Sequence, residues 1–317
     1  IEDIQRAVGL ARNQAWLSGE PGRALVVPTE ALRAAVSGTV QRGLAGIAER
    51  VATTLTWDDV VLDEDVLAGL GEIVLYARHR QKVFEDWGFG RTLPYGRANS
   101  SLFTGPPGTG KTMVASLIAR ELGMDLFRVD VSQIVSKYVG ETEKNLARVF
   151  EEASRGNAVL LFDEADSLFA KRTQVQSSHD RYSNLEVNFL LQRIESFAGV
   201  TILTSNLVDN IDPAFLRRIK FRVNFPFPEE AERALLWRVM LPGAAALDPG
   251  VDLERLGRLF ELAGGGIKNA ALRAAFHAAE RGTPITQELL EDAGVAEYRA
   301  MGKLLRVHEG RPLLPSE

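Results

Sequence analysis

The chain has 317 residues, 45% of them apolar and 25% charged, enough to bury a sizeable core in two domains or in one large domain with an appendage. Its net charge of −5 gives no general attraction to nucleic acid or an anionic membrane, and no apolar run is long enough to span a bilayer. The lack of cysteine excludes disulfides and thiolate metal sites, which suits the cytoplasm, and the four histidines form no HExxH zinc motif.

Residues 1–50 are predicted to be a helical segment. They repeat the end of the chain weakly but in order, since residues 3–11 can be laid on residues 266–274 and residues 28–32 on residues 285–289. Two interpretations stay open: the segment is the lid of an upstream degenerate module, or it is an ordinary alanine-rich helical hairpin. Because the chain starts at Ile1, we expect a processed chain or a fragment.

Residues 51–226 are predicted to form the large domain. Short apolar runs alternate there with amphipathic stretches, which is typical of a parallel sheet covered by helices on both faces. The predicted strands are 100–104, 125–129, 159–162, 200–204 and 221–225, the last one ended by Pro226 and Pro228. We therefore expect an α/β fold.

A glycine-rich loop, GPPGTGKT at residues 105–112, joins the first predicted strand to a helix. Gly105, Gly108 and Gly110 leave room for backbone N–H groups to turn toward phosphates. Lys111 adds a positive charge, and Thr112 offers a hydroxyl to Mg²⁺. This string in this setting predicts that a nucleoside triphosphate binds.

Two acids, Asp163 and Glu164, follow the apolar strand 159–162. The end of such a strand lies beside the phosphate loop in doubly wound folds. Asp163 would hold Mg²⁺ through water, and Glu164 would polarise the attacking water as general base. The alternative is an acid pair that caps the next helix, and the nearby loop favours the catalytic interpretation.

Asn206 follows the strand 200–204 in the same way. Its amide could reach the γ-phosphate side and orient the water. The alternative is an asparagine that closes a turn before Asp209.

Residues 227–317 are predicted to be a small helical domain. They are rich in Ala, Leu, Arg and Glu and contain no strand-like run. Breaks are expected at Pro242, Pro249, residues 264–266 and residues 282–284.

With these motifs the chain resembles an AAA-type ATPase of the AAA+ superfamily, in its protein-remodelling clade, over about residues 55–300. The resemblance implies a P-loop NTPase sheet followed by a helical lid, with ATP and Mg²⁺ as cofactors. Walker A is then 105–112, Walker B is 160–164 and sensor 1 is Asn206. The implied nucleotide contacts are Gly105, Pro106, Pro107, Gly108, Thr109, Gly110, Lys111, Thr112, Met113 and Asp163, with Thr112 and Asp163 at the metal.

The resemblance also implies a homo-oligomeric ring, usually a hexamer, in which a neighbour's arginine reaches the γ-phosphate. Residues 211–218 resemble the segment that carries this arginine finger, which maps to Arg218 or Arg217. The segment is about two residues shorter than usual, and Phe221 stands where a second arginine is often found, so the choice stays open. The alternative is a pair of surface arginines at a helix end.

Residues 136–145 resemble the central-pore loop of AAA protein remodellers, in which an aromatic residue grips an extended polypeptide. Lys137, Tyr138 and Val139 would be the gripping residues here, since an aromatic ring can wedge between side chains of any sequence. The alternative is a tyrosine packed at the start of a helix. Residues 171–184 would be a second pore-facing loop or simply a solvated segment.

Two further assignments follow from the resemblance alone. Asp59, Val60 and Val61 lie in a segment whose backbone contacts adenine in the family. Lys268 occupies the sensor 2 region, where it would touch phosphate or be a solvated lysine at a helix start.

The predicted function is Mg²⁺-dependent ATP hydrolysis in a ring, coupled to unfolding, threading or disassembly of a protein substrate. Residues 216–230 and 264–275 are similar to bacterial two-module AAA proteins encoded with contractile injection systems. The rival functions are a nucleic-acid motor or loader, which the acidic charge disfavours, and an inactive ATP-binding scaffold. A dinucleotide oxidoreductase is excluded because the loop is GxxxxGK[ST] and not GxGxxG.

Overall fold

The structure is a computed structural model that describes residues 8–9, 29–93, 96–134, 141–166, 178–207, 211–303, 307–308 and 311–312. The chain divides into two compact units. The first contains residues 1–53, 69–103 and 114–223, and the second contains residues 54–68, 104–113 and 224–317. In the described part of the chain, no helix has both the length and the apolar character needed to cross a membrane.

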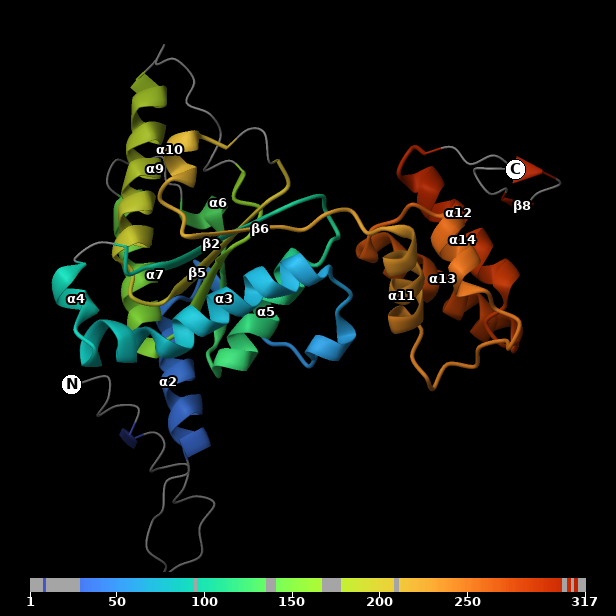
Figure 1. Ribbon diagram of the computed structural model, residues 1–317, viewed down its shortest axis with the longest axis horizontal. Coiled ribbons are helices and arrows are strands. Elements are labelled where there is room, and N and C mark those ends of the chain that lie inside the picture. Colours follow the sequence, from blue (N-terminus) through green and yellow to red (C-terminus); the bar gives the residue numbers. More distant parts are fainter. Residues whose placement is uncertain are drawn as a thin grey trace, which may run out of the picture. The chain divides into compact units, whose positions relative to one another are not determined.

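A six-stranded sheet forms the centre of the first unit (Figure 1). Its strands are β1 (Ala48–Val51), β2 (Asn99–Thr104), β3 (Leu126–Val129), β4 (Val159–Phe162), β5 (Val200–Ser205) and β6 (Phe221–Asn224), in the spatial order β1-β3-β4-β5-β2-β6. β3, β4 and β5 run parallel in register, with Phe162 opposite Leu203. All five strands predicted from the sequence are present, which confirms the α/β fold.

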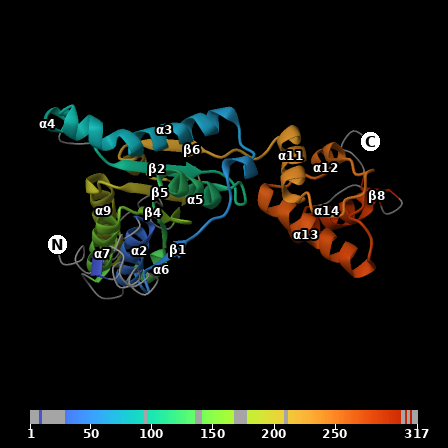
Figure 2. The ribbon, with the colours of Figure 1, turned by 90° about the horizontal axis from the view of Figure 1, so that it is seen from below.

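Helices cover both sides of this sheet (Figure 2). α3 (Glu64–Gln81) and α5 (Lys111–Leu122) lie on one side, while α7 (Glu141–Gly156) and α9 (Ser178–Ser196) lie on the other. Shorter elements are α4 (Phe89–Thr92), α6 (Val131–Ile134), α10 (Pro213–Leu216) and a π-helical turn over Lys82–Asp86. On α7 the buried side chains recur at residues 146, 149, 150 and 153, the spacing of one helix face, and they pack on the strands.

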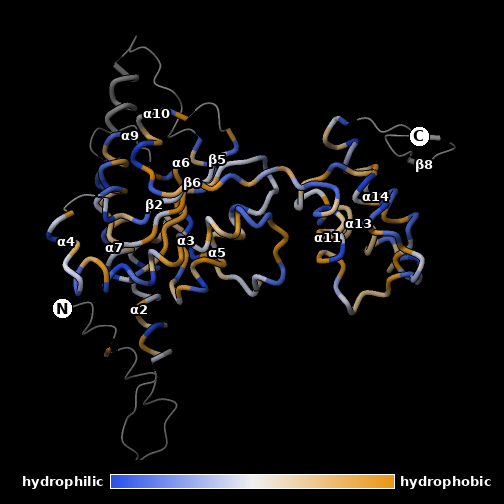
Figure 3. The backbone as a smooth tube through the Cα atoms, in the orientation of Figure 1, coloured by the Kyte–Doolittle hydropathy of each residue, from blue (hydrophilic) through white to orange (hydrophobic). Residues whose placement is uncertain are grey.

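The core of the first unit lies between the sheet and these helices. Figure 3 shows hydrophobic residues along the central strands, where β4 is a continuous apolar run that is buried throughout. A strand with this composition is stable only when both of its faces are covered. The sheet therefore gives a rigid support to the polar residues that follow β4 and β5.

Residues 29–51 add two elements to the first unit that were not predicted there from the sequence. α2 (Thr29–Gly43) packs against α7, and β1 pairs antiparallel with β3 at the edge of the sheet. The prediction that residues 48–50 are helical was wrong, because β3 offers its free edge to this short polar segment, and the sheet is mixed rather than wholly parallel. The domain boundary at residue 50 stays a prediction. An origin of residues 1–50 in an upstream module stays a prediction.

The second unit contains a helical domain made of α11 (Glu230–Met240), α12 (Leu253–Leu259), α13 (Gly264–Arg281) and α14 (Gln287–Ala300). Trp237 and Phe260 are buried at its centre, and Arg233 donates hydrogen bonds of 2.8 Å to the carbonyl groups of Pro228 and Gly257. A short 3-10 helix, Trp57–Asp59, also belongs to this unit.

Two details of the helical domain differ from the prediction. Residues 264–266 begin α13 instead of breaking the helix, because the packing of Ile267 and Ala270 in the core of the helical domain outweighs the low helix propensity of glycine. The two-residue strands β7 (Val307–His308) and β8 (Arg311–Pro312) pair with each other, although no strand was expected in residues 227–317.

Candidate active site

The phosphate loop predicted at residues 105–112 leaves β2 and enters α5. Gly105, Gly108 and Gly110 have φ values of +137°, +78° and +96°, which residues with a side chain rarely adopt. A Cβ atom on Gly105 would stand 2.1 Å from the carbonyl oxygen of Phe225. The shape of the loop therefore requires glycine at these positions.

Lys111 directs its charge into this loop. Its side chain is 7% exposed, and its Nζ donates hydrogen bonds to the carbonyl oxygens of Gly105 (2.7 Å) and Pro106 (2.8 Å). Thr109 also donates to Pro106, at 2.9 Å, which closes the turn. Phosphate oxygens need hydrogen-bond donors. The loop offers backbone N–H groups at its glycines and in the first turn of α5, together with the buried ammonium group of Lys111. The loop therefore fits the nucleotide that the sequence predicts. Met113 and the hydroxyl of Thr112 lie in that first turn.

Asp163 and Glu164 follow the last residue of β4, as expected. Glu164 has φ +50°, a left-handed conformation that is uncommon for a residue with a side chain, and it turns the chain away from the strand direction. Asp163 is half-buried, whereas Glu164 is exposed. The side chain of Glu164 can therefore meet a ligand while Asp163 stays anchored to the sheet.

A threonine on the neighbouring strand ties these acids to β5. The hydroxyl of Thr204 donates to Oδ1 of Asp163 at 2.7 Å and accepts from the backbone N–H of Glu164 at 2.9 Å. Thr204 was not predicted from the sequence. The signal that could have found it is a polar side chain close to the end of a strand that is otherwise largely apolar.

Asn206, the predicted sensor residue, follows the last residue of β5 and is held from the β4 side. Its backbone N–H donates to the carboxylate of Asp166 at 3.2 and 3.3 Å, and the hydroxyl of Ser205 donates to the same carboxylate. Asp166 was not predicted from the sequence. Side-chain hydrogen bonds thus join the ends of β4 and β5 twice. Thr204 of β5 bonds to the two acids after β4, and Asp166 after β4 bonds to Ser205 and Asn206.

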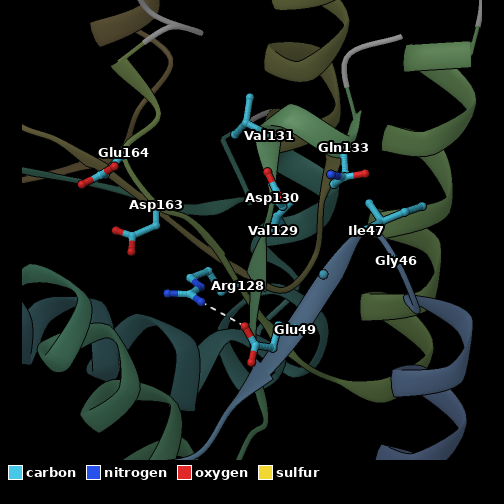
Figure 4. A pocket seen from close by; sticks show the side chains of 11 residues that line it. Gly46, Ile47, Glu49, Arg128, Val129, Asp130, Val131, Gln133, Asp163 and Glu164 are labelled. Atoms are coloured by element: carbon cyan, nitrogen blue, oxygen red, sulfur yellow. Dashed lines mark hydrogen bonds and ion pairs between the residues drawn. The ribbon is translucent and has the colours of Figure 1, made fainter.

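A pocket of about 830 Å³ lies beside the acid pair within the first unit (Figure 4). Its walls come from the turn before β1, from β1 and β3, and from the segment after β3. Asp163 and Glu164 are at one end, and Arg128 of β3 forms a 2.9 Å ion pair with Glu49 of β1. The edge strand that the sequence did not predict therefore builds part of the surroundings of the two acids.

The two candidate finger residues lie after α10. Arg217 and Arg218 are both exposed, and Nε of Arg218 forms an ion pair of 3.5 Å with Glu195 of α9. Both side chains are open to solvent, and the choice between them stays a prediction.

In the second unit, the segment predicted to contact adenine and the predicted sensor 2 region lie on different elements. Asp59 accepts hydrogen bonds from the N–H and hydroxyl of Thr56, at 2.7 and 3.0 Å, and Val61 packs against the core of the helical domain. The N–H of Gly265 donates to the carbonyl of Gly108 in the phosphate loop at 3.1 Å, while Lys268 is exposed one turn into α13.

Other contacts predicted from the sequence stay predictions. Val60 is partly buried, and nothing in its contacts assigns it to adenine. Lys137, Tyr138 and Val139 lie outside the described residues, as do residues 167–177 of the second predicted loop, whereas residues 178–184 belong to α9.

Comparison with known proteins gives a family match over the part of the chain that carries these motifs. Residues 101–227 match the family model described as "ATPase family associated with various cellular activities (AAA)". The match includes the phosphate loop, both acids, Asn206 and both candidate arginines.

Three relatives illustrate the similarity. The chain is 35% identical over 247 residues to the ATP-dependent zinc metalloprotease FtsH 3 of Sphaerobacter thermophilus, covering 75% of this chain and 48% of that protein. It is 30% identical over 248 residues to the proteasome-activating nucleotidase of Saccharolobus islandicus, covering 75% and 61%. It is 31% identical over 191 residues to cell division protein C of Sulfolobus acidocaldarius, covering 57% and 49%.

The chain thus spans about half to three fifths of the length of these relatives. The similarity extends well beyond the segment that matches the family model. Together with the loop, the acid pair and Asn206, it shows that the chain is a member of the AAA family of ATPases.

Proposed function

We propose that the protein hydrolyses ATP in the presence of Mg²⁺ as a ring-shaped homo-oligomer, and that hydrolysis drives the remodelling of a protein substrate. The observation that carries this proposal is the hydrogen-bonded junction at the ends of β4 and β5. There Glu164 is held in a left-handed conformation beside Asp163, and Asn206 follows the adjacent strand. A strained acid supported in this way is typical of a catalytic residue.

Each residue of the junction and the loop has a role in this proposal. The loop and Lys111 bind the phosphates of ATP, and Thr112 and Asp163 hold Mg²⁺, which neutralises charge on the phosphate oxygens when bound. Glu164 accepts the proton of the attacking water, and Asn206 orients that water. Orientation and charge stabilisation account for most of the catalysis in such reactions.

A ring is proposed because the candidate arginines are exposed rather than buried in their own unit. A guanidinium that reaches a neighbour's γ-phosphate must be accessible at the surface, and such a group raises turnover by about 10³- to 10⁵-fold in related phosphoryl-transfer enzymes. Turnover is then expected to rise with protein concentration as subunits assemble. A hexamer is the size that the family resemblance implies.

A protein substrate is favoured over nucleic acid. Two of the relatives are named for proteolysis, as an ATP-dependent metalloprotease and a proteasome-activating nucleotidase. The net charge of −5 also gives no general attraction to a polyanion. Protease activity itself is not proposed, since the 317 residues contain no HExxH motif. A link to contractile injection systems stays a prediction, and so does a cytoplasmic location.

Substitution of the proposed general base tests the proposal. Glu164→Gln should leave ATP bound and lower the rate of phosphate release by about 10²-fold or more, because general-base catalysis contributes about that much. Glu151→Gln, which alters an exposed acid of α7, is the matched control and should hydrolyse ATP at the wild-type rate. An unchanged rate in Glu164→Gln would remove Glu164 as the base. A wild-type protein that binds ATP at ring-forming concentrations but releases no phosphate would support the scaffold alternative.

A further inference from the structure

Thr204 joins the proposed catalytic acids to the neighbouring strand through a single hydroxyl group. The residue lies in β5, one position beyond Leu203, which is in register with Phe162 of β4. Its side chain is 1% exposed. The hydroxyl donates to Oδ1 of Asp163 at 2.7 Å and accepts from the N–H of Glu164 at 2.9 Å. The hydroxyl therefore uses its one donor hydrogen and one of its acceptor lone pairs on the two acids.

The contact with Glu164 acts on a backbone conformation that needs support. Glu164 has φ +50°, and a left-handed residue with a side chain persists only where its surroundings hold it. The next residue, Ala165, donates its N–H to the carbonyl oxygen of Thr204 at 2.9 Å. One bond in this turn thus depends on the side chain of Thr204, and the other depends only on its backbone.

The contact with Asp163 fixes the orientation of a carboxylate. Since Oδ1 accepts from a buried hydroxyl, rotation of the carboxyl group breaks a charge-assisted hydrogen bond. A shift of the order of 1 Å in a catalytic group costs much of the rate even when the substrate still binds. The hydroxyl is therefore placed to control the geometry of both acids at once.

We propose that Thr204 is a positioning residue for ATP hydrolysis: its hydroxyl holds the carboxylate of Asp163 and the backbone turn that presents Glu164. This inference rests on the proposed function. Neither the family match nor any named relative assigns a role to this residue. Its removal should affect the rate of the chemical step more than the binding of nucleotide.

Thr201 provides a matched control on the same strand. It is also 1% exposed, but its hydroxyl has no hydrogen-bond partner. Valine has nearly the shape of threonine and lacks the hydroxyl. Thr204→Val therefore removes two hydrogen bonds, Thr201→Val removes none, and Thr204→Ser keeps the hydroxyl while losing a methyl group.

The first measurement uses nucleotide-free protein and amide hydrogen exchange followed by NMR. In Thr204→Val the amide of Glu164 should exchange roughly tenfold or more faster than in the wild type, because its acceptor is gone. The amide of Ala165 should remain protected, since its acceptor is a backbone carbonyl. Thr204→Ser and Thr201→Val should both retain the wild-type exchange rate at Glu164. Equal protection of Glu164 in Thr204→Val and wild type would overturn the proposed contact without reference to ATP hydrolysis.

The second measurement separates binding from turnover. Thr204→Val should lower kcat roughly ten- to a hundredfold, the range for losing a hydrogen bond to a charged group, with KM changed by less than about threefold. Thr204→Ser should recover most of kcat, and Thr201→Val should match the wild type. If Thr204→Val does not fold, Thr204→Ala takes its place with the same expected values.

Failure of the proposed role of Thr204 and failure of the proposed function give different results. Wild-type kcat in a folded Thr204→Val, or an equal loss of kcat in Thr204→Ser, would overturn the role of the hydroxyl while ATP hydrolysis by the wild type still stands. A wild type without turnover would overturn the proposed function and this inference together.

Discussion

Val40 of α2 and Gly156 of α7 lie so close that a Cβ atom on residue 156 would stand 2.3 Å from Cγ2 of Val40. The same two helices also meet at Gly43, where a Cβ atom would lie 2.5 Å from the carboxylate of Glu152. Val40 is buried in the core of the first unit. The helix that precedes the ATPase motifs is thus packed into the large unit through positions that only glycine can occupy without a shift.

Gly156→Ala should therefore destabilise the first unit by about 1–3 kcal/mol, the usual cost of overpacking. Gly38→Ala is the control, because α2 has open space around residue 38 and alanine favours a helix there. It should be neutral or stabilising by up to about 1 kcal/mol. Urea denaturation compares the midpoints, and Val40→Ala combined with Gly156→Ala should cost less than the sum of the two single substitutions. Equal midpoints for Gly156→Ala and wild type would contradict the close packing of α2 on α7.

Gly105→Ala should abolish ATP binding. The substitution brings a methyl group against the carbonyl oxygen of Phe225, and residue 105 has a backbone φ of +137°. The loop therefore has to change shape, at a cost of at least about 2 kcal/mol. Gly243→Ala, at an exposed turn with nothing near its Cβ position, should bind ATP as the wild type does. Isothermal calorimetry with a slowly hydrolysed ATP analogue measures both affinities. Wild-type affinity in Gly105→Ala would show that the loop tolerates a different shape.

An arginine finger that acts on a neighbouring subunit can be tested by mixing variants. Arg218→Ala should hydrolyse little ATP, and so should Lys111→Ala, for the separate reason that it binds ATP poorly. Mixed rings should regain partial turnover, since the Lys111→Ala subunits still present Arg218 to intact sites. If Arg217→Ala loses turnover instead, the finger is one residue earlier.

Arg222→Ala is the matched control for this experiment, because it removes an exposed arginine of β6 outside the finger segment. It should keep wild-type turnover. A mixture of Arg218→Ala and Lys111→Ala with no more phosphate release than the two separate proteins would argue against action between subunits.

Tyr138→Ala should uncouple ATP use from mechanical work. If the ring of Tyr138 grips the polypeptide, its removal lowers the amount of substrate unfolded for each ATP hydrolysed, whereas Tyr138→Phe keeps the ring and should keep this ratio. A fluorescent protein with an unstructured tail reports unfolding, and phosphate release reports ATP use in the same sample. Full unfolding by Tyr138→Ala would end the pore-loop prediction.

Much of the fold could be predicted from the sequence because its signals are local. The apolar runs of β4 and β5 and the helical spacing on α7 each lie within a few residues, and the structure has these elements where they were expected. β1 could not be predicted in the same way. Its four residues, Ala-Glu-Arg-Val, carry no strong strand signal, and they become a strand because β3 has an edge for them to pair with.

The candidate site shows the same division. By itself the sequence determined the phosphate loop, the two acids after β4 and the asparagine after β5, because phosphate chemistry demands those residue types at short, fixed spacings. Only the tertiary structure decided that Thr204 and Asp166 join the two strand ends, and that Glu49 and Arg128 line the same pocket as the acids. These partners are about 40 to 80 residues apart along the chain, so no local pattern links them, and their contacts arise only when the sheet sets the strands side by side.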